Sequence, residues 1–138
     1  MSLLRDIQVE SARLKFVVGD ANLTGDASYH AFLWSKSRGV QDLGVLNVGS
    51  ISIAQGINSS GTVVGGSATL GNFSFHAFIW TPSGGMEDLN NLIPAGTGWT
   101  LSNATAINKS GQIVGTGMRS GDFTQHAFLL TPTSPLSQ

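Results

Sequence analysis

A five-residue motif occurs three times in this chain at nearly constant spacing, and the repetition limits the possible fold more than any other feature. The copies are His30–Trp34, His76–Trp80 and His126–Leu130, and their histidines lie 46 and 50 residues apart. A second marker keeps the same phase: Val17-Val18-Gly19, Val63-Val64-Gly65 and Ile113-Val114-Gly115 each end eleven residues before the next histidine. The chain is therefore a repeat array.

The residues around these markers predict four short strands in each unit. A first strand is expected at Ile53–Asn58 and at Thr105–Asn108, each followed by a polar pair and a glycine that suit a hairpin with left-handed glycine. The Val-Val-Gly marker begins the second strand, and the His-Ala-Phe motif forms the third. A fourth strand is expected at Val40–Leu43 and Met86–Leu89.

The third strand has large side chains on one face and small ones on the other. Alternation along a strand puts His76, Phe78 and Trp80 on one face, and Ala77 and Ile79 on the opposite one. Because both faces are apolar, we expect the strand to be buried on both sides. Such strands suit stacked sheets, in which the bulky face of one fills the hollow of the next.

The predicted fold is all-β, with β-propeller-like blades of four antiparallel strands. The repeat length lies in the range of propeller blades, and the chain supplies about three blade equivalents, which we expect to close by oligomerisation. A β-sandwich is the alternative, although a sandwich has no need to repeat one sequence at fixed phase. Residues 1–138 form one array: an atypical segment (1–14), two repeats (15–61 and 62–111), a half repeat (112–132) and a tail (133–138).

These motifs resemble the HAF repeat, which occurs in tandem in bacterial proteins regarded as extracellular or surface-associated. The matching runs, between about Lys15 and Pro132, are His-Ala-Phe-(Leu/Ile)-Trp, Gly-(Val/Met)-x-Asp-Leu and (Gly/Ala)-Ile-Asn-x-Ser-Gly-x-(Val/Ile)-Val-Gly. The resemblance implies a propeller-like β fold, an extracellular or cell-surface location, and no assigned catalytic residue or ligand. The sequence departs from a full array, because it holds about two and a half repeats and residues 1–14 lack the Ile-Asn-x-Ser-Gly run.

Composition excludes several classes of protein. Charged residues make up 11% of the chain and the net charge is -1, so we expect no basic face for nucleic acid. There is no cysteine, and hence no disulfide or thiolate metal site. No apolar run reaches the roughly 20 residues of a membrane span, and the N-terminal residues lack the apolar core of a signal peptide.

The three histidines are the first candidates for catalysis, since Asp42 and Asp88 each lie twelve residues after a histidine. A catalytic group is needed once, whereas a structural hydrogen bond is needed in every unit. We therefore predict structural roles, with no catalytic, cofactor or metal site, for the six repeat residues His30, His76, His126, Phe32, Phe78 and Phe128. The run Asp20–Gly25 begins like a calcium loop, but Ala31 stands where its glutamate is expected.

The loop expected at Asn90–Asn103 is the one segment that breaks the repeat, and it carries Trp99 among glycines and threonines. In a propeller, the loops between second and third strands and those between units lie at one face. Trp99 should then lie near Tyr29, Phe73 and Phe123, and this face is the predicted contact surface for a ligand or partner. The alternative is that Trp99 caps the end of its own core.

These observations leave three functional hypotheses. The first is a non-enzymatic propeller module that self-assembles and presents loops to a partner, such as a surface protein. The second is a lectin-like propeller that binds a glycan, and the third is a fragment of a hydrolase.

Self-association follows from the strand count, because three blade equivalents cannot close and two chains supply six. A homodimer is therefore expected. The Asp6-Ile7 step within Leu3–Val9 resembles the Asp-Leu of the fourth strand, so this segment is expected to complete the third unit of a partner chain.

Overall fold

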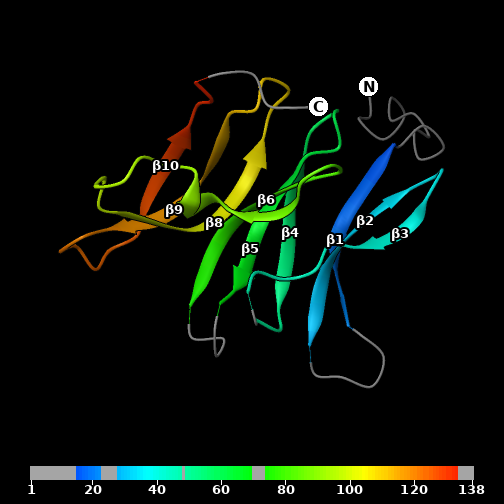
Figure 1. Cartoon of the computed structure of the whole chain (residues 1–138), viewed down its shortest axis with the longest axis horizontal. Helices are drawn as coiled ribbons and strands as arrows, with labels where there is room; N and C mark the ends of the chain where they lie inside the picture. Colours follow the sequence, from blue (N-terminus) through cyan, green and yellow to red (C-terminus); the bar gives the residue numbers. More distant parts are fainter. Residues whose placement is uncertain (1–14, 23–27, 48, 70–73, 134–138) are drawn as a thin grey trace, which may run out of the picture.

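The computed structural model describes residues 15–22, 28–47, 49–69 and 74–133, and these form three antiparallel sheets in chain order (Figure 1). The first sheet contains β1 (Phe16–Asn22), β2 (Tyr29–Ser35) and β3 (Gly39–Asp42); the second β4 (Ser52–Ile57), β5 (Val63–Ala68), β6 (Phe75–Thr81) and β7 (Gly85–Asp88); the third β8 (Trp99–Ile107), β9 (Ile113–Arg119) and β10 (His126–Leu130). A turn of 3-10 helix, η3 (Leu89–Asn91), follows β7. The predicted all-β class is confirmed.

The second sheet is a complete repeat unit. Its strands pair in the order β4-β5-β6-β7, so each strand is antiparallel to the one before it in the chain. Within the described residues, the first sheet has no counterpart of β4 and the third sheet no counterpart of β7. These residues form no closed ring. The segment 1–14, expected to complete a partner's third unit, lies outside the described part of the chain.

The Ile-Asn step of each first strand shapes the hairpin that follows. Asn58 accepts hydrogen bonds through its side-chain oxygen from the backbone N–H groups of Ser60 and Thr62, and Gly61 takes the expected left-handed conformation with φ of 81°. The side-chain amide nitrogen of Asn58 also donates to the carbonyl oxygen of Asn108, at 3.1 Å. The asparagine thus fixes its own turn and ties it to the same turn of the next unit.

Direct pairing explains why the two sequence markers keep step. The glycine of the Val-Val-Gly marker lies opposite the phenylalanine of the third strand in all three sheets: Gly19 with Phe32, Gly65 with Phe78, and Gly115 with Phe128. A β-carbon at Gly65 would lie 2.9 Å from the Phe78 ring and would overlap the carbonyl oxygen of Ile53. The phenylalanine ring therefore occupies the space that glycine leaves.

The third unit differs from the sequence prediction at its start. The strand expected at Thr105–Asn108 instead begins at Trp99, inside the segment predicted as a loop. Two register shifts relative to β9 lie within it, and Trp99 pairs with Arg119. The prediction was wrong because it relied on the repeated Ile-Asn run, which marks only the last part of β8.

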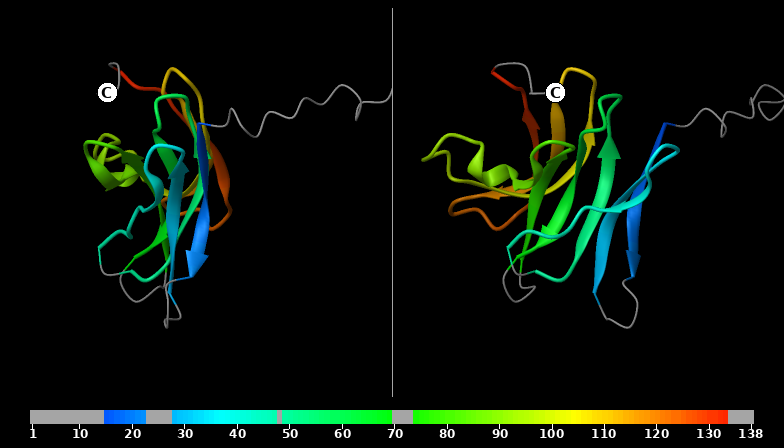
Figure 2. Two further views of the ribbon diagram at one scale, coloured as in Figure 1. Left: turned by 90° about the vertical axis from the view of Figure 1, so that its right-hand side faces the viewer. Right: turned by 45° about the vertical axis from the view of Figure 1, so that its right-hand side comes forward.

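The three sheets lie in chain order across the molecule, with the second between the other two (Figure 2). Strand β4 packs against β1 and β2 of the first sheet, and β8 packs in the same way against β5 and β6 of the second. One apolar cluster lies at each of these two junctions. In the second sheet Ala77, Phe78, Ile79 and Trp80 are all buried, which confirms the prediction of a strand covered on both faces.

No helix in the described residues is long and apolar enough to cross a membrane.

Candidate functional site

The third and fourth strands of the first two units are joined by a histidine and an aspartate. His30 Nδ1 lies 2.9 Å from Asp42 Oδ1, and His76 Nδ1 lies 2.7 Å from Asp88 Oδ2. Strand pairing sets this geometry, because each aspartate lies opposite the phenylalanine two residues after its histidine. The pair thus recurs with the same ring nitrogen at equivalent positions.

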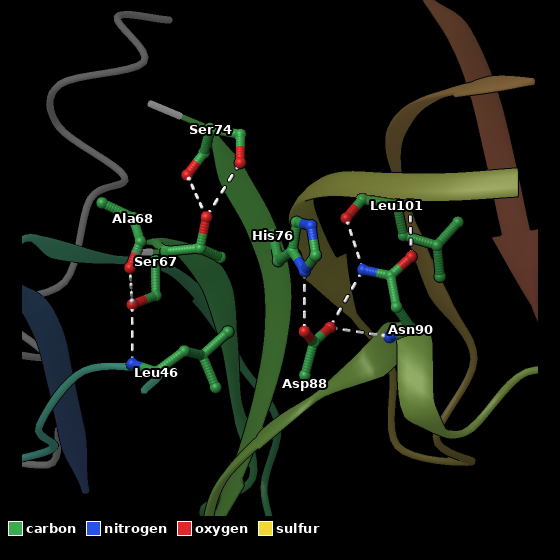
Figure 3. Close-up of polar contacts among 9 residues, drawn as sticks. Leu46, Ser67, Ala68, Ser74, His76, Asp88, Asn90 and Leu101 are labelled. Atoms are coloured by element: carbon green, nitrogen blue, oxygen red, sulfur yellow. Dashed lines mark hydrogen bonds and ion pairs between the residues drawn. The ribbon is translucent and has the colours of Figure 1, made fainter. Parts of the chain in front are cut away.

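The second pair continues into the next unit (Figure 3). Asp88 Oδ1 accepts hydrogen bonds from the backbone and the side chain of Asn90, both at 2.9 Å. Asn90 in turn donates to the carbonyl oxygen of Leu101 and accepts from its N–H, at 2.9 and 2.7 Å. A continuous polar chain therefore runs from β6 through β7 and η3 to β8, and it fixes the second sheet against the third.

The third histidine has a different partner. His126 uses Nε2 rather than Nδ1, and it contacts Asp122 Oδ2 at 2.7 Å within the β9–β10 hairpin. Asp122 also accepts from the hydroxyl of Thr124 at 2.7 Å and from its N–H at 3.0 Å. These bonds from Thr124, followed by the His126 ring, hold the pKa of Asp122 well below its usual range.

Acid titration should reveal this carboxylate. Because the pKa of Asp122 is lowered in the folded state, its contribution to stability is complete above the unfolded value of ~4 and is lost as the pH falls from there toward the folded pKa. Asp122→Asn should therefore flatten the dependence of the melting temperature on pH below about 4. Thermal melts from pH 2 to 6, with Asp20→Asn as the matched control, check this. Identical acid slopes for Asp122→Asn and the unaltered chain would contradict the assignment.

Each junction between sheets brings a small face against a bulky one. At the second junction Val64, Ala77, Ile79 and Leu89 pack against five residues of the third sheet: Leu101, Ala104, Ile107, Ile113 and Phe128. At the first junction Ala31, Leu33 and Leu43 occupy the positions of Ala77, Ile79 and Leu89, and they pack against four residues of the second sheet: Ala54, Val63, Phe78 and Trp80. The two junctions are therefore built from equivalent apolar residues on the small side, packed against larger apolar side chains.

The outer sheets each leave one such face open. On the third sheet, Leu129 is 60% exposed and Val114 42%, whereas the equivalent Ile79 and Val64 are 5% and 0% exposed. On the first sheet, Val17 is 39% exposed while its equivalent Val63 is fully buried. The prediction that every third strand is covered on both sides is thus wrong for β10. The chain displays one open small face and one open bulky face.

The three described residues of the predicted contact face, Tyr29, Trp99 and Phe123, do not form one group. Trp99 is half-buried, and its ring meets those of His126 and Phe128 edge to face at centroid distances of 6.3 and 6.5 Å. Phe123 is almost fully exposed in the adjacent hairpin, which is joined to the start of β8 by a bond from Ser120 N–H to the Gly98 carbonyl. Tyr29 lies in the first sheet, two sheets away. Phe73 lies outside the described residues.

The structure adds residues that the sequence did not single out. Asn90 and Asp122 carry the polar links of the second and third units. Asn90 stands where the first unit has Gly44, whereas Asp122 belongs to a turn that recurs in the sequence as Gly25-Asp26 and Gly71-Asn72. Val17, Val114 and Leu129 lie on the open faces. The repeat aligns them with Val63, Val64 and Ile79, which are buried in the second sheet. Among the described residues, no group of three or more His, Cys, Asp or Glu side chains could hold a metal ion.

Comparison of the chain with protein-family models, with curated proteins and with solved structures gives no match.

Proposed function

We propose that this chain is a non-enzymatic, propeller-like repeat module that associates with further copies of itself and presents its hairpins to a partner. The observation that carries the proposal is the pair of open faces. The third sheet exposes Leu129 and Val114 at positions that are buried in the second sheet, and the first sheet exposes Val17 in the same sense. An exposed apolar face of this kind favours association.

The two open faces are complementary, which favours head-to-tail stacking. The small face of the third sheet carries Val114 and Leu129 where the second sheet has Val64 and Ile79. At the second junction, the face of Val64 and Ile79 packs against a bulky one. The first sheet offers a bulky face with Phe32 and Trp34 half-buried. Stacking one copy on the next would bring a small face against a bulky one, as at the two internal junctions, with β1 and β2 in place of the first strand that β4 and β8 supply there. Such heterologous contacts form a ring when the rotation closes, and two chains supply six units.

A structural role for the histidines supports a binding module rather than an enzyme. His30 and His76 make the same Nδ1 contact with an aspartate, as repeated structural elements do. His126 is also paired with a carboxylate, although it uses Nε2 and contacts Asp122 of its own hairpin. The proposal includes membership of the HAF repeat family and the extracellular or cell-surface location that the resemblance implies.

The hairpin between β9 and β10 is the candidate surface for a partner outside the array. Phe123 projects there with almost no cover, beside a half-buried Trp99 that packs on its own sheet. The half-buried ring favours the core-capping role for Trp99, so Phe123 is the stronger contact residue.

Leu129→Glu tests the association. A carboxylate on the small face would be buried without a partner in the stacked assembly, so we expect association to weaken at least about a hundredfold. Light scattering over a concentration series, with circular dichroism to verify folding, measures this. Phe123→Glu is the matched control, since it adds the same charge to the same sheet outside the stacking face. Equal masses for both variants and the unaltered chain at every concentration would refute the proposal.

A further inference from the structure

The outer edge of β10 is unpaired among the described residues, at the position where the other two sheets carry a fourth strand. In those sheets Asp42 lies opposite Phe32 and Asp88 lies opposite Phe78. The equivalent partner of Phe128 would be an aspartate whose carboxylate reaches the histidine two residues earlier. His126 instead contacts Asp122 through Nε2, so its Nδ1 lacks the carboxylate that a fourth strand supplies to His30 and His76.

A half-open hollow of about 310 Å³ lies beside this edge. Its walls come from β8, β10 and the loop after η3, and the residues that line it include Ile93, Pro94, Trp99, Leu101, Phe128 and Leu130. In the second sheet Met86 lies opposite Trp80 and packs against the apolar cluster on the same face as Phe78. The corresponding place beside β10, opposite Leu130, is next to this hollow. A fourth strand here requires an apolar residue two positions before its aspartate.

The sequence contains one unused segment with these properties. Only three aspartates in the chain are followed by leucine or isoleucine: Asp6, Asp42 and Asp88. Two of them already end fourth strands. If Asp6 lies opposite Phe128, Leu4 lies opposite Leu130 at the hollow, and Ile7 takes the position of the buried Leu43 and Leu89. Residues 1–14 lie outside the described part of the chain, and they form the available segment.

One difference between this segment and the other fourth strands has a physical reason. The strands β3 and β7 begin with glycines of positive φ, 69° at Gly39 and 71° at Gly85, because each follows a tight hairpin from the third strand. Leu3 stands at that position in the N-terminal segment. A strand that comes from another chain needs no such hairpin, so a leucine is acceptable there.

We propose that residues 3–7 of a second copy add to the edge of β10 as its fourth strand, and that Asp6 of that copy binds Nδ1 of His126. This inference rests on the proposed head-to-tail association. In one chain the second sheet separates β1 from β10 (Figure 1), whereas stacking puts the first sheet of the next copy directly against the third sheet. In that arrangement β1 of the next copy, which follows the N-terminal segment in the chain, belongs to the sheet that packs on the sheet of β10. Strand addition of this kind gains main-chain hydrogen bonds along the edge, and the side-chain contacts set its register.

Asp6→Asn in the full-length chain tests the contact. A hydrogen bond to a charged group contributes enough that its loss should weaken association about tenfold to a hundredfold. The ¹⁵N signal of His126 Nδ1 should move at the same time. Glu87→Gln, which removes one negative charge from the exposed part of β7, is the control and should leave both readouts unchanged.

Mixing two variants tests whether the strand comes from a second copy. In a mixed dimer of Asp6→Asn and His126→Gln chains, one of the two sites joins an intact Asp6 to an intact His126. Mixing should therefore restore part of the association that each variant has lost alone. No restoration, or an Asp6→Asn chain that associates as tightly as the unaltered one, would overturn the inference. Neither result touches the proposed function, which is tested separately by the association of the unaltered chain and of Leu129→Glu.

Discussion

Phe78→Ala is expected to lower the free energy of unfolding by ~3–5 kcal/mol, since a large ring is removed from a fully buried site. Phe78 lies in the middle sheet, packs in the cluster at the first junction, and covers Gly65 on the neighbouring strand. The other face of the same strand carries Ala77 and Ile79, which are buried against the third sheet. Because sheets cover both faces, the structure has little freedom to collapse into the cavity. Denaturant unfolding, read from the midpoint at constant slope, measures the change.

Phe32→Ala is the matched control for this prediction. Phe32 occupies the same repeat position but lies half-buried on the open face of the first sheet. At low protein concentration its replacement should cost much less than that of Phe78. If copies stack head to tail, the cost should rise with protein concentration, because association protects the folded state. A cost below ~1 kcal/mol for Phe78→Ala would contradict the stacked arrangement of the sheets.

Gly65→Ala should have the second large effect, a loss of about 3 kcal/mol of unfolding free energy from overpacking. The added methyl group would overlap the backbone carbonyl of Ile53 and would lie 2.9 Å from the ring of Phe78. The backbone of β4 cannot move aside without losing its pairing with β5. Thermal and denaturant unfolding of this variant measure the loss.

Gly19→Ala provides the comparison at the equivalent position of the first unit. Among the described residues, a β-carbon at Gly19 meets only the edge of the Phe32 ring, at 3.1 Å. A ring edge can shift by a few tenths of an ångström, so this substitution should be tolerated better. Equal losses of unfolding free energy at the two glycines would contradict this explanation. They would show that the contact with Ile53 in β4 is not what excludes a side chain at Gly65.

The sequence predicted much of each unit because its markers correspond to direct contacts. The spacing between glycine and histidine follows from the pairing of Gly65 with Phe78, and the twelve residues from His76 to Asp88 follow from the hairpin between β6 and β7. The Ile-Asn-x-Ser-Gly run predicted a turn that Asn58 stabilises through local hydrogen bonds. Local geometry of this kind is encoded within a few residues and repeats with them.

Other features depended on what surrounds each unit. Leu129 and Ile79 have nearly the same side chain, and they differ in exposure because no sheet covers the outer face of β10 in the described chain. His126 contacts Asp122 rather than an aspartate of a fourth strand, since the described residues place no fourth strand beside β10. Repeat patterns also leave the angle between successive sheets unspecified, so they could not show whether the array closes. The start of β8 was missed because the repeat marker covers only the last residues of this strand.

Cross-linking of mixed single-cysteine chains tests the head-to-tail association most directly. The chain contains no cysteine, so Val17→Cys marks the open bulky face alone and Leu129→Cys marks the open small face alone. A short bifunctional maleimide should link a Val17→Cys chain to a Leu129→Cys chain far more efficiently than it links either variant to itself. Cross-linked pairs formed mainly within one variant, or no cross-linked pairs at concentrations where the unaltered chain associates, would contradict head-to-tail stacking.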